Sequence, residues 1–246
     1  MSDVDKRGID RIKKVLSFFG GDSSTGNKYF TLKSETIGTD NFRKLLAGTF
    51  SPIAREYGFE GAGFYYNRLI ADHYIHILEF QVSKWGGSCC VEMCVHIDFL
   101  PTSSGKERHP KHLKAVDCEI RRRLAPKGKS GFWWGYGSNE REALESIKDI
   151  INTFKTEGLS FFEHFNNFPK PFDAITIKDL EEEGFRFRYG LEYAIPNIRL
   201  VLMLARIHLY IGDKIKAREF SEYGLNNIGN ATSPLTPLFE EIIAKC

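Results

Sequence analysis

Residues 89–100 read Cys-Cys-Val-Glu-Met-Cys-Val-His-Ile-Asp-Phe-Leu and carry the clearest periodicity in the chain. The odd positions are apolar apart from the first, a cysteine, and the even positions up to residue 98 are Cys90, Glu92, Cys94, His96 and Asp98. A period of two places these sets on opposite faces of a β-strand. The pattern predicts a strand of an antiparallel sheet that is packed on one side only.

Two similar segments precede this strand, and one follows it. Residues 64–69 and 74–85 are rich in β-branched and aromatic side chains, and short connections of the kind found in hairpins link the three segments. Residues 132–136, Phe-Trp-Trp-Gly-Tyr, are a candidate fourth strand. We expect an antiparallel sheet of about four strands.

Two segments have the apolar spacing of helices that pack on such a sheet. The first runs from capping residues at 39–41 to Gly58, with Pro52 expected to kink or restart it. The second opens at Ser138 and Asn139 and is expected to end at Gly158. The apolar stripes are Phe42, Leu45, Leu46 and Phe50 in the first helix and Leu144, Ile147, Ile151 and Phe154 in the second.

The remaining periodic segments divide the chain into three regions. Residues 194–212 and 213–225 predict a helical hairpin, and residues 236–245 predict a last helix. The fold class is therefore α+β, with helices packed on one face of the sheet and a C-terminal helical hairpin. We expect an N-terminal helix and loop at 1–38, an α+β core domain at 39–171 and a helical C-terminal appendage packed on the core at 172–246.

A succession of short motifs extends from about residue 40 to residue 170. They are Glu56-Tyr57-Gly58-Phe59, then Gly63-Phe64-Tyr65-Tyr66-Asn67-Arg68, the strand from His76 to Trp85, Val95-His96-Ile97, and Gly158-Leu159-Ser160-Phe161-Phe162. This order resembles a bacterial family of domains of unknown function (the 4304 family). The resemblance implies an α+β domain with a small antiparallel sheet and carries no established activity. Domains of this kind often occur near toxin and immunity genes, which implies a neutralising, protein-binding role.

The C-terminal region has a weaker resemblance of its own. The small residues of Leu204-Ala205, Gly212-Asp213, Ala217 and Gly224-Leu225 are similar to one tetratricopeptide unit near 194–225. A solenoid needs about three repeats to bury its core. We therefore expect a single helical hairpin docked on the main domain.

Composition places the chain among globular proteins. Its 246 residues include 34 basic and 32 acidic side chains, a net charge of +2, and 42% are hydrophobic. These values exclude disordered and collagen-like classes. The five cysteines are odd in number and unevenly spaced, and no apolar run approaches the ~20 residues that span a bilayer. We expect a reduced, cytoplasmic protein without a disulfide framework, leader or membrane partner.

Motifs for common catalytic chemistry are missing from the sequence. No G-x-S-x-G elbow, Walker loop or G-x-G-x-x-G fingerprint opens a helix. Two sets of possible ligands, Cys90, Cys94 and His96 on one strand and His109, His112 and Cys118 in a basic loop, are poorly spaced or surrounded by cations. We expect no metal, no cofactor and a binding protein rather than an enzyme. An acid–base pair of His96 with Glu92 or Asp98 stays open.

The strongest surface signal is a basic segment at 106–129, where nine cations face three carboxylates. Aromatic residues follow it directly, so the segment suits an acidic protein surface or stacked bases. A solvated loop with tryptophans in the core is the third interpretation. If residues 121–123 are helical, Ile120 and Leu124 pin the helix while the arginines project outward. The candidate partner-binding residues are Arg121, Arg122, Arg123, Lys127, Lys129, Trp133, Trp134, Glu92, His96 and Asp98.

We therefore predict a cytoplasmic protein-binding module, an immunity protein that neutralises a cognate bacterial toxin or effector. The alternative is a nucleic-acid-binding accessory protein that uses residues 106–136. The sequence does not predict an oligomeric state.

Overall fold

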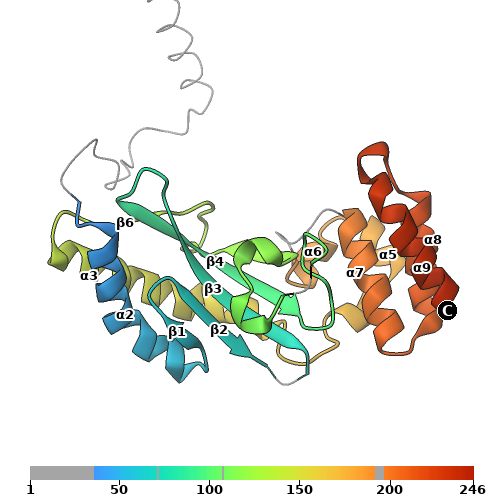
Figure 1. Ribbon diagram of the computed structural model, residues 1–246, viewed down its shortest axis with the longest axis horizontal. Helices are drawn as coiled ribbons and strands as arrows, with labels where there is room; N and C mark the ends of the chain where they lie inside the picture. The colour runs from blue at the N-terminus through green and yellow to red at the C-terminus, as the bar shows by residue number, and fades with distance from the viewer. Residues whose placement is uncertain (1–35, 71, 107, 192–196) are drawn as a thin grey trace, which may run out of the picture. The chain divides into compact units, whose positions relative to one another are not determined.

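The computed structural model describes residues 36–70, 72–106, 108–191 and 197–246 (Figure 1). The chain divides at Ser34, and the fold below belongs to the unit Glu35–Cys246. The predicted N-terminal helix lies outside the described residues.

An antiparallel sheet of six strands forms the centre of this unit. Its main path runs β1-β2-β3-β4-β5, and β6 pairs with the beginning of β4. The predicted α+β class and antiparallel sheet are confirmed. The short strands β1 and β5 account for the difference from about four. The strands are β1 (Glu60–Ala62), β2 (Tyr65–Leu69), β3 (Tyr74–Val82), β4 (Ser88–Ile97), β5 (Ile120–Arg123) and β6 (Trp134–Gly135).

The three consecutive arginines lie on strand β5 and not on a helix, so the helical interpretation of residues 120–124 was wrong. Ile120 pairs with Val95, and Arg122 pairs with Met93. Residues four apart share a face in a helix and also in a strand. The spacing of Ile120 and Leu124, both buried, therefore fits either element. The pairing of residues 120–123 with β4 makes this segment a strand.

Helices α2 (Thr39–Glu56) and α3 (Glu140–Thr153) pack against one face of the sheet (Figure 1). The backbone N–H of Glu142 donates to the Asn139 side chain at 3.1 Å, which caps α3 as predicted. Helix α2 contains Pro52 and does not restart there.

Gly158 does not end the second helix as predicted. A π-turn (Phe154–Gly158) leads directly into α4 (Leu159–Glu163). A Cβ at Gly158 would lie 2.8 Å from the Phe154 ring and 3.3 Å from Met93 and Leu124. The glycine therefore marks a close approach of helix to sheet.

The second face of the sheet is also covered, which corrects the expectation of a sheet packed on one side. Residues 110–118 form two 3₁₀ turns, η1 (Pro110–His112) and η2 (Ala115–Asp117), across this face. Tyr65 donates its hydroxyl to the Leu113 carbonyl at 2.5 Å, and Ala115 N–H donates to Glu79 at 2.6 Å. The apolar side chains buried between this segment and the sheet are Ile75, Ile77, Cys94, Leu113, Ala115 and Cys118.

The C-terminal region is helical, and the predicted hairpin and last helix are confirmed. A Cβ at Gly224 would lie 2.4 Å from the Phe239 ring, so α8 and α9 cross closely at this glycine. No helix in the described ranges combines the length and apolar character needed to cross a bilayer. The elements are η4 (Phe172–Ala174), α5 (Ile177–Glu181), α6 (Phe185–Arg188), α7 (Asn197–Tyr210), α8 (Lys214–Asn226), η5 (Asn230–Leu235) and α9 (Thr236–Lys245).

Candidate functional site: a basic pocket at the edge strand

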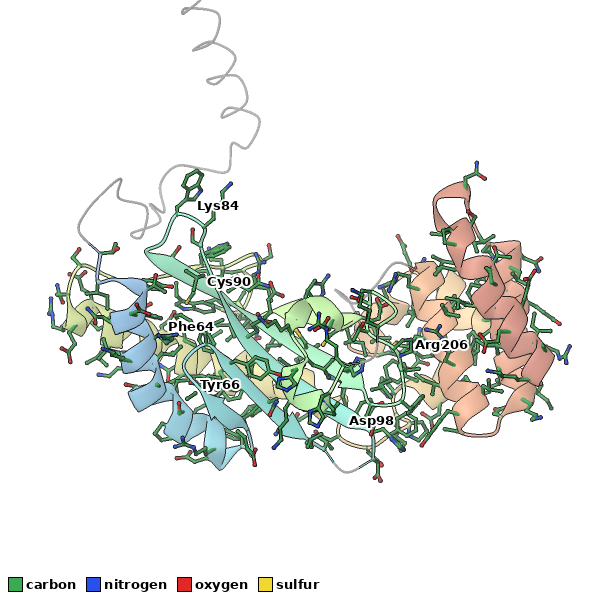
Figure 2. The ribbon with its side chains drawn as sticks, viewed as in Figure 1. Phe64, Tyr66, Lys84, Cys90, Asp98 and Arg206 are labelled. Carbon is green, nitrogen blue, oxygen red and sulfur yellow. The ribbon has the colours of Figure 1, made fainter. Side chains whose placement is uncertain are left out.

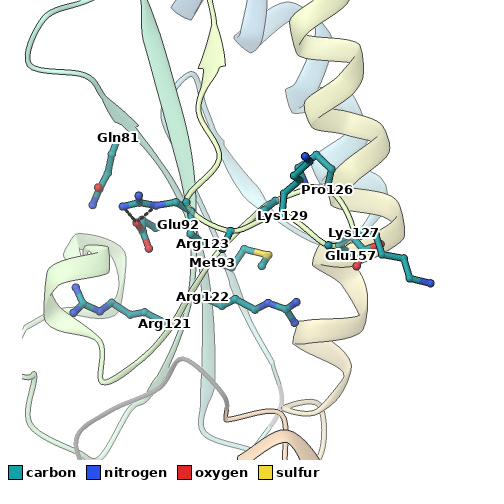
Figure 3. Close-up of a pocket in the computed structure, with 14 residues that line it drawn as sticks. Gln81, Glu92, Met93, Arg121, Arg122, Arg123, Pro126, Lys127, Lys129 and Glu157 are labelled. Carbon is teal, nitrogen blue, oxygen red and sulfur yellow. Dashed lines mark hydrogen bonds and ion pairs between the residues drawn. The ribbon is translucent and has the colours of Figure 1, made fainter. Parts of the chain in front are cut away.

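A cavity of about 420 Å³ lies at strand β5 and the loop that follows it (Figure 3). We call this cavity the basic pocket. It brings together five of the ten predicted site residues from one stretch of chain and a sixth, Glu92, from β4. Its charged and polar lining consists of Arg121, Arg122, Arg123, Lys127, Lys129, Gln81, Glu92, Ser130 and Glu157.

The alternation of β5 divides the arginines between two sides of the sheet. Arg123 pairs with Glu92 and Arg121 with Cys94, on the face covered by residues 110–118. Figure 3 shows Arg121 and Arg122 pointing in opposite directions from the strand. The basic pocket therefore extends around the sheet edge, a shape that consecutive arginines on a helix would not produce.

A tight turn presents the two lysines. Lys129 N–H donates to the Pro126 carbonyl at 2.9 Å, and Gly128 between them has φ +74°. A type II turn requires a positive φ at this third position, which favours glycine. Lys127 and Lys129 are exposed on either side of Gly128.

Arg123 and Glu92 form an ion pair in the basic pocket. Arg123 donates from Nε at 2.9 Å and from Nη2 at 2.7 Å to the same carboxylate oxygen. Partial burial acts to lower the pKa of Arg123, but the hydrogen bonds to Glu92 outweigh it, and the pKa is raised. The Arg123 guanidinium therefore remains charged at neutral pH.

The charge of the basic pocket suits an anionic ligand. Five guanidinium and ammonium groups face two carboxylates, and Glu92 is already engaged by Arg123. The neighbouring Cys90 is no nucleophile at neutral pH, because burial raises the pKa of its thiol to about 11.

The two predicted tryptophans have different positions. Trp133 is 38% exposed, and the Arg123 guanidinium lies 5.5 Å from its ring centroid, within the range of a cation–π contact. Trp134 is buried in the core and donates its indole N–H to Asp149 at 2.8 Å. The structure thus corrects the prediction for Trp134, whose alternation along β6 places it under α3.

His96 and Asp98 do not join Glu92 in one polar surface. His96 is buried, and burial lowers the pKa of its imidazole. Asp98 is exposed at the other end of β4 from Cys90 (Figure 2). It forms a hydrogen bond with His73 at 2.8 Å. The expected polar face is therefore divided by the cover of residues 110–118.

Two members of the second set of possible metal ligands form hydrogen bonds with the backbone. His109 accepts a hydrogen bond from Lys111 N–H at 3.2 Å, and the buried Cys118 thiol donates to the Lys114 carbonyl at 3.5 Å. In the described part of the chain, no group of three or more His, Cys, Asp or Glu residues is arranged to hold a metal ion.

Three residues of the basic pocket lie outside β5 and the loop that follows it and were not among the predicted site residues: Gln81, Met93 and Glu157. Gln81 and Met93 lie on strands that were predicted, so the register of β3 and β4 would have placed them. No local pattern signals Glu157, because it reaches the basic pocket from the helical layer.

Residues 50–164 match the family model described as a domain of unknown function (DUF4304). The matched stretch is similar to this family. It lies inside the predicted range of about 40–170, which confirms the resemblance, and it contains every residue of the basic pocket. No curated protein and no solved structure matches the chain.

Proposed function

We propose that the DUF4304-like domain is a protein-binding module that docks an acidic surface of a partner at the basic pocket. One observation carries the proposal: five cations line one pocket around a sheet edge, and an exposed tryptophan contacts one of them, Arg123. Arginine and tryptophan are the residues that most often anchor protein interfaces. Charge complementarity of this kind also accelerates association.

Trp133 supports the same proposal through its contact with Arg123. The guanidinium holds the ring while 38% of it stays accessible. A rigid aromatic side chain of this kind contributes contact area without a large loss of conformational entropy on binding. The Lys127–Lys129 turn adds two exposed cations to the same pocket as Arg123.

The narrower form of the proposal is neutralisation of a cognate bacterial toxin. It is supported by the family resemblance and by a pocket rich in binding groups. Its test is growth of a host that expresses the product of the adjacent gene, with and without this chain. Rescue of growth supports neutralisation. Equal growth in both cultures overturns it.

Copurification tests the broader proposal. The probe is the product of the adjacent gene, co-expressed with the wild-type chain or with Arg121→Glu/Lys127→Glu/Lys129→Glu. The triple variant should lose the partner. The control variant, Lys178→Glu/Lys214→Glu, reverses two exposed charges outside the pocket and should retain the partner. Absence of copurification, or retention by the triple variant, overturns the proposal.

Nucleic acid is the second candidate, favoured by the same exposed Trp133 beside cations. A single-stranded oligothymidine probe would show it, because log K falls with log[salt] at a slope of about −0.7 for each neutralised phosphate. Under our proposal the oligothymidine probe binds weakly, and its binding does not show this dependence on salt. Tight, salt-dependent binding that is lost on Trp133→Ala would favour nucleic acid instead.

A further inference from the structure

Strand β5 has one paired side and one open side. Leu124 N–H donates to the Val91 carbonyl at 2.8 Å, and the register pairs Arg122 with Met93. In an antiparallel pair, alternate residues direct their N–H and C=O groups toward the partner strand, and the residues between them direct theirs away. Arg121 and Arg123 therefore direct their backbone groups away from β4.

Nothing in the described part of the chain pairs with this open side. Strand β5 ends the main path of the sheet, and none of the backbone hydrogen bonds found outside the strand ladders involves Arg121 or Arg123. Such an edge is a template for an additional strand. Peptide recognition by strand addition uses edges of this kind, with main-chain hydrogen bonds for affinity and alternate side chains for specificity.

The side chains of the same two residues indicate what such a strand would carry. Arg121 and Arg123 project to one side of β5, about 7 Å apart. An added strand places its own alternate side chains at the same spacing, so carboxylates at every second position would meet both guanidiniums. Charged edges disfavour strands without complementary charge, so these arginines select an acidic segment.

We propose that β5 accepts an extended acidic segment of a partner protein as an added strand. The segment exchanges backbone hydrogen bonds with Arg121 and Arg123 and directs acidic side chains toward their guanidinium groups. The inference rests on the proposed function and narrows the partner's binding element to a strand. The cavity of about 420 Å³ beside β5 holds the side chains at the end of the segment.

Two peptides of equal charge test the added strand. The first is blocked Glu-Val-Glu-Val-Glu-Val-Glu, and the second is the same peptide with N-methylated glutamates. Residues directly opposite Arg121 and Arg123 would form the hydrogen bonds, so methylation removes those donors and leaves the charge. The first peptide should bind wild-type protein about tenfold more tightly than the second, the order expected when several backbone hydrogen bonds are lost.

Amide hydrogen exchange locates the binding on the strand. In the free protein the amides of Arg121 and Arg123 should exchange much faster than those of Arg122 and Leu124, which face β4. The first peptide should slow exchange at Arg121 and Arg123 and leave the other two unchanged. Protection elsewhere, or none, overturns the inference.

A proline variant adds a test from the side of the protein. Arg121→Pro and Arg121→Ala remove the same charge, but only proline removes the outward N–H, a change that edge strands tolerate. The proline variant should bind the first peptide several-fold more weakly than the alanine variant. Should Arg121→Pro fail to fold, the two peptides on wild-type protein still decide the question.

The outcomes separate this inference from the proposed function. Equal binding of both peptides means that charge alone docks an acidic partner, so strand addition is overturned and the function stands. The same holds if neither peptide binds but the adjacent gene product copurifies in a charge-dependent manner. If neither peptide binds and copurification fails, both proposals fall.

Discussion

The two faces of the sheet are covered by different means. On one face, α2, α3 and α4 build a continuous aromatic core, in which the Phe50 ring lies 5.3 Å from Phe80 and 5.6 Å from Phe154. On the other face, residues 110–118 bury only a small apolar cluster. Beyond that cluster the second face carries Gln81, Glu92 and two arginines and opens into the basic pocket. The basic pocket therefore lies on the part of the second face that residues 110–118 leave uncovered.

Truncation of a buried aromatic side chain on the helix-covered face should cause the largest loss of stability. Phe154 is fully buried among Phe50, Tyr57 and Phe59. Phe154→Ala leaves a cavity that these rings cannot fill, and should cost about 3–5 kcal/mol in the free energy of unfolding. Urea denaturation measures this change.

Leu113→Ala is the matched truncation under the thinner cover. Leu113 is also fully buried, but its cluster is small, and a short segment can relax around the gap. We expect a loss of about 2 kcal/mol, at the lower end for buried leucines. A loss as large as that of Phe154→Ala would show that the two faces contribute equally.

Acid should loosen the helix-covered face through His76. Burial, with the nearby Arg68 guanidinium, lowers the pKa of His76 from 6.5 to about 3. Arg68 donates to its Nδ1 at 3.1 Å, so the other nitrogen carries the proton and donates to the Phe165 carbonyl at 2.8 Å. Above pH 6.5 both the folded and the unfolded states hold neutral His76. Below it only the unfolded state gains a proton, so stability falls as the pH falls toward 3.

The expected loss is about 2 kcal/mol between pH 6.5 and 5, since one pKa unit corresponds to about 1.4 kcal/mol. Urea unfolding at several pH values measures it. His76→Gln should flatten the pH dependence, and His112→Gln, a change at an exposed position, should leave it as in wild type. An unchanged slope in His76→Gln would contradict this assignment.

The two faces also differ in how far the sequence predicts them. The helix-covered face follows from strong local signals: period-two strands, the Asn139 cap and buried aromatic stripes. The second face depends on long-range contacts, such as Tyr65 with Leu113 and Glu79 with Ala115, that leave no local pattern. The arginines were selected as candidates from their charge, but their arrangement depends on the pairing of β5 with β4.

Arg123 forms an ion pair with the buried Glu92 on the second face. Its replacement should therefore lower the stability of the fold by a moderate amount. Arg123→Ala leaves the Glu92 carboxylate, only 9% exposed, without its cation. An unpaired buried charge is costly, and we expect a loss of about 1–2 kcal/mol in urea denaturation. The double variant Arg123→Ala/Glu92→Gln should recover part of it. Unchanged stability of Arg123→Ala would show that water replaces the guanidinium.

Arg121 provides the smallest effect on stability and the clearest contrast with Phe154. Its side chain is exposed on an edge strand, so Arg121→Ala should change the free energy of unfolding by no more than about 0.5 kcal/mol. The same change removes one of the two guanidinium groups that face an added acidic strand. Association with the glutamate–valine peptide should slow, and the salt dependence of its rate should decrease. Stopped-flow fluorescence and urea denaturation on the same sample measure both quantities. A stability loss of several kcal/mol would show that Arg121 supports the fold, and the open part of the second face would then be structural.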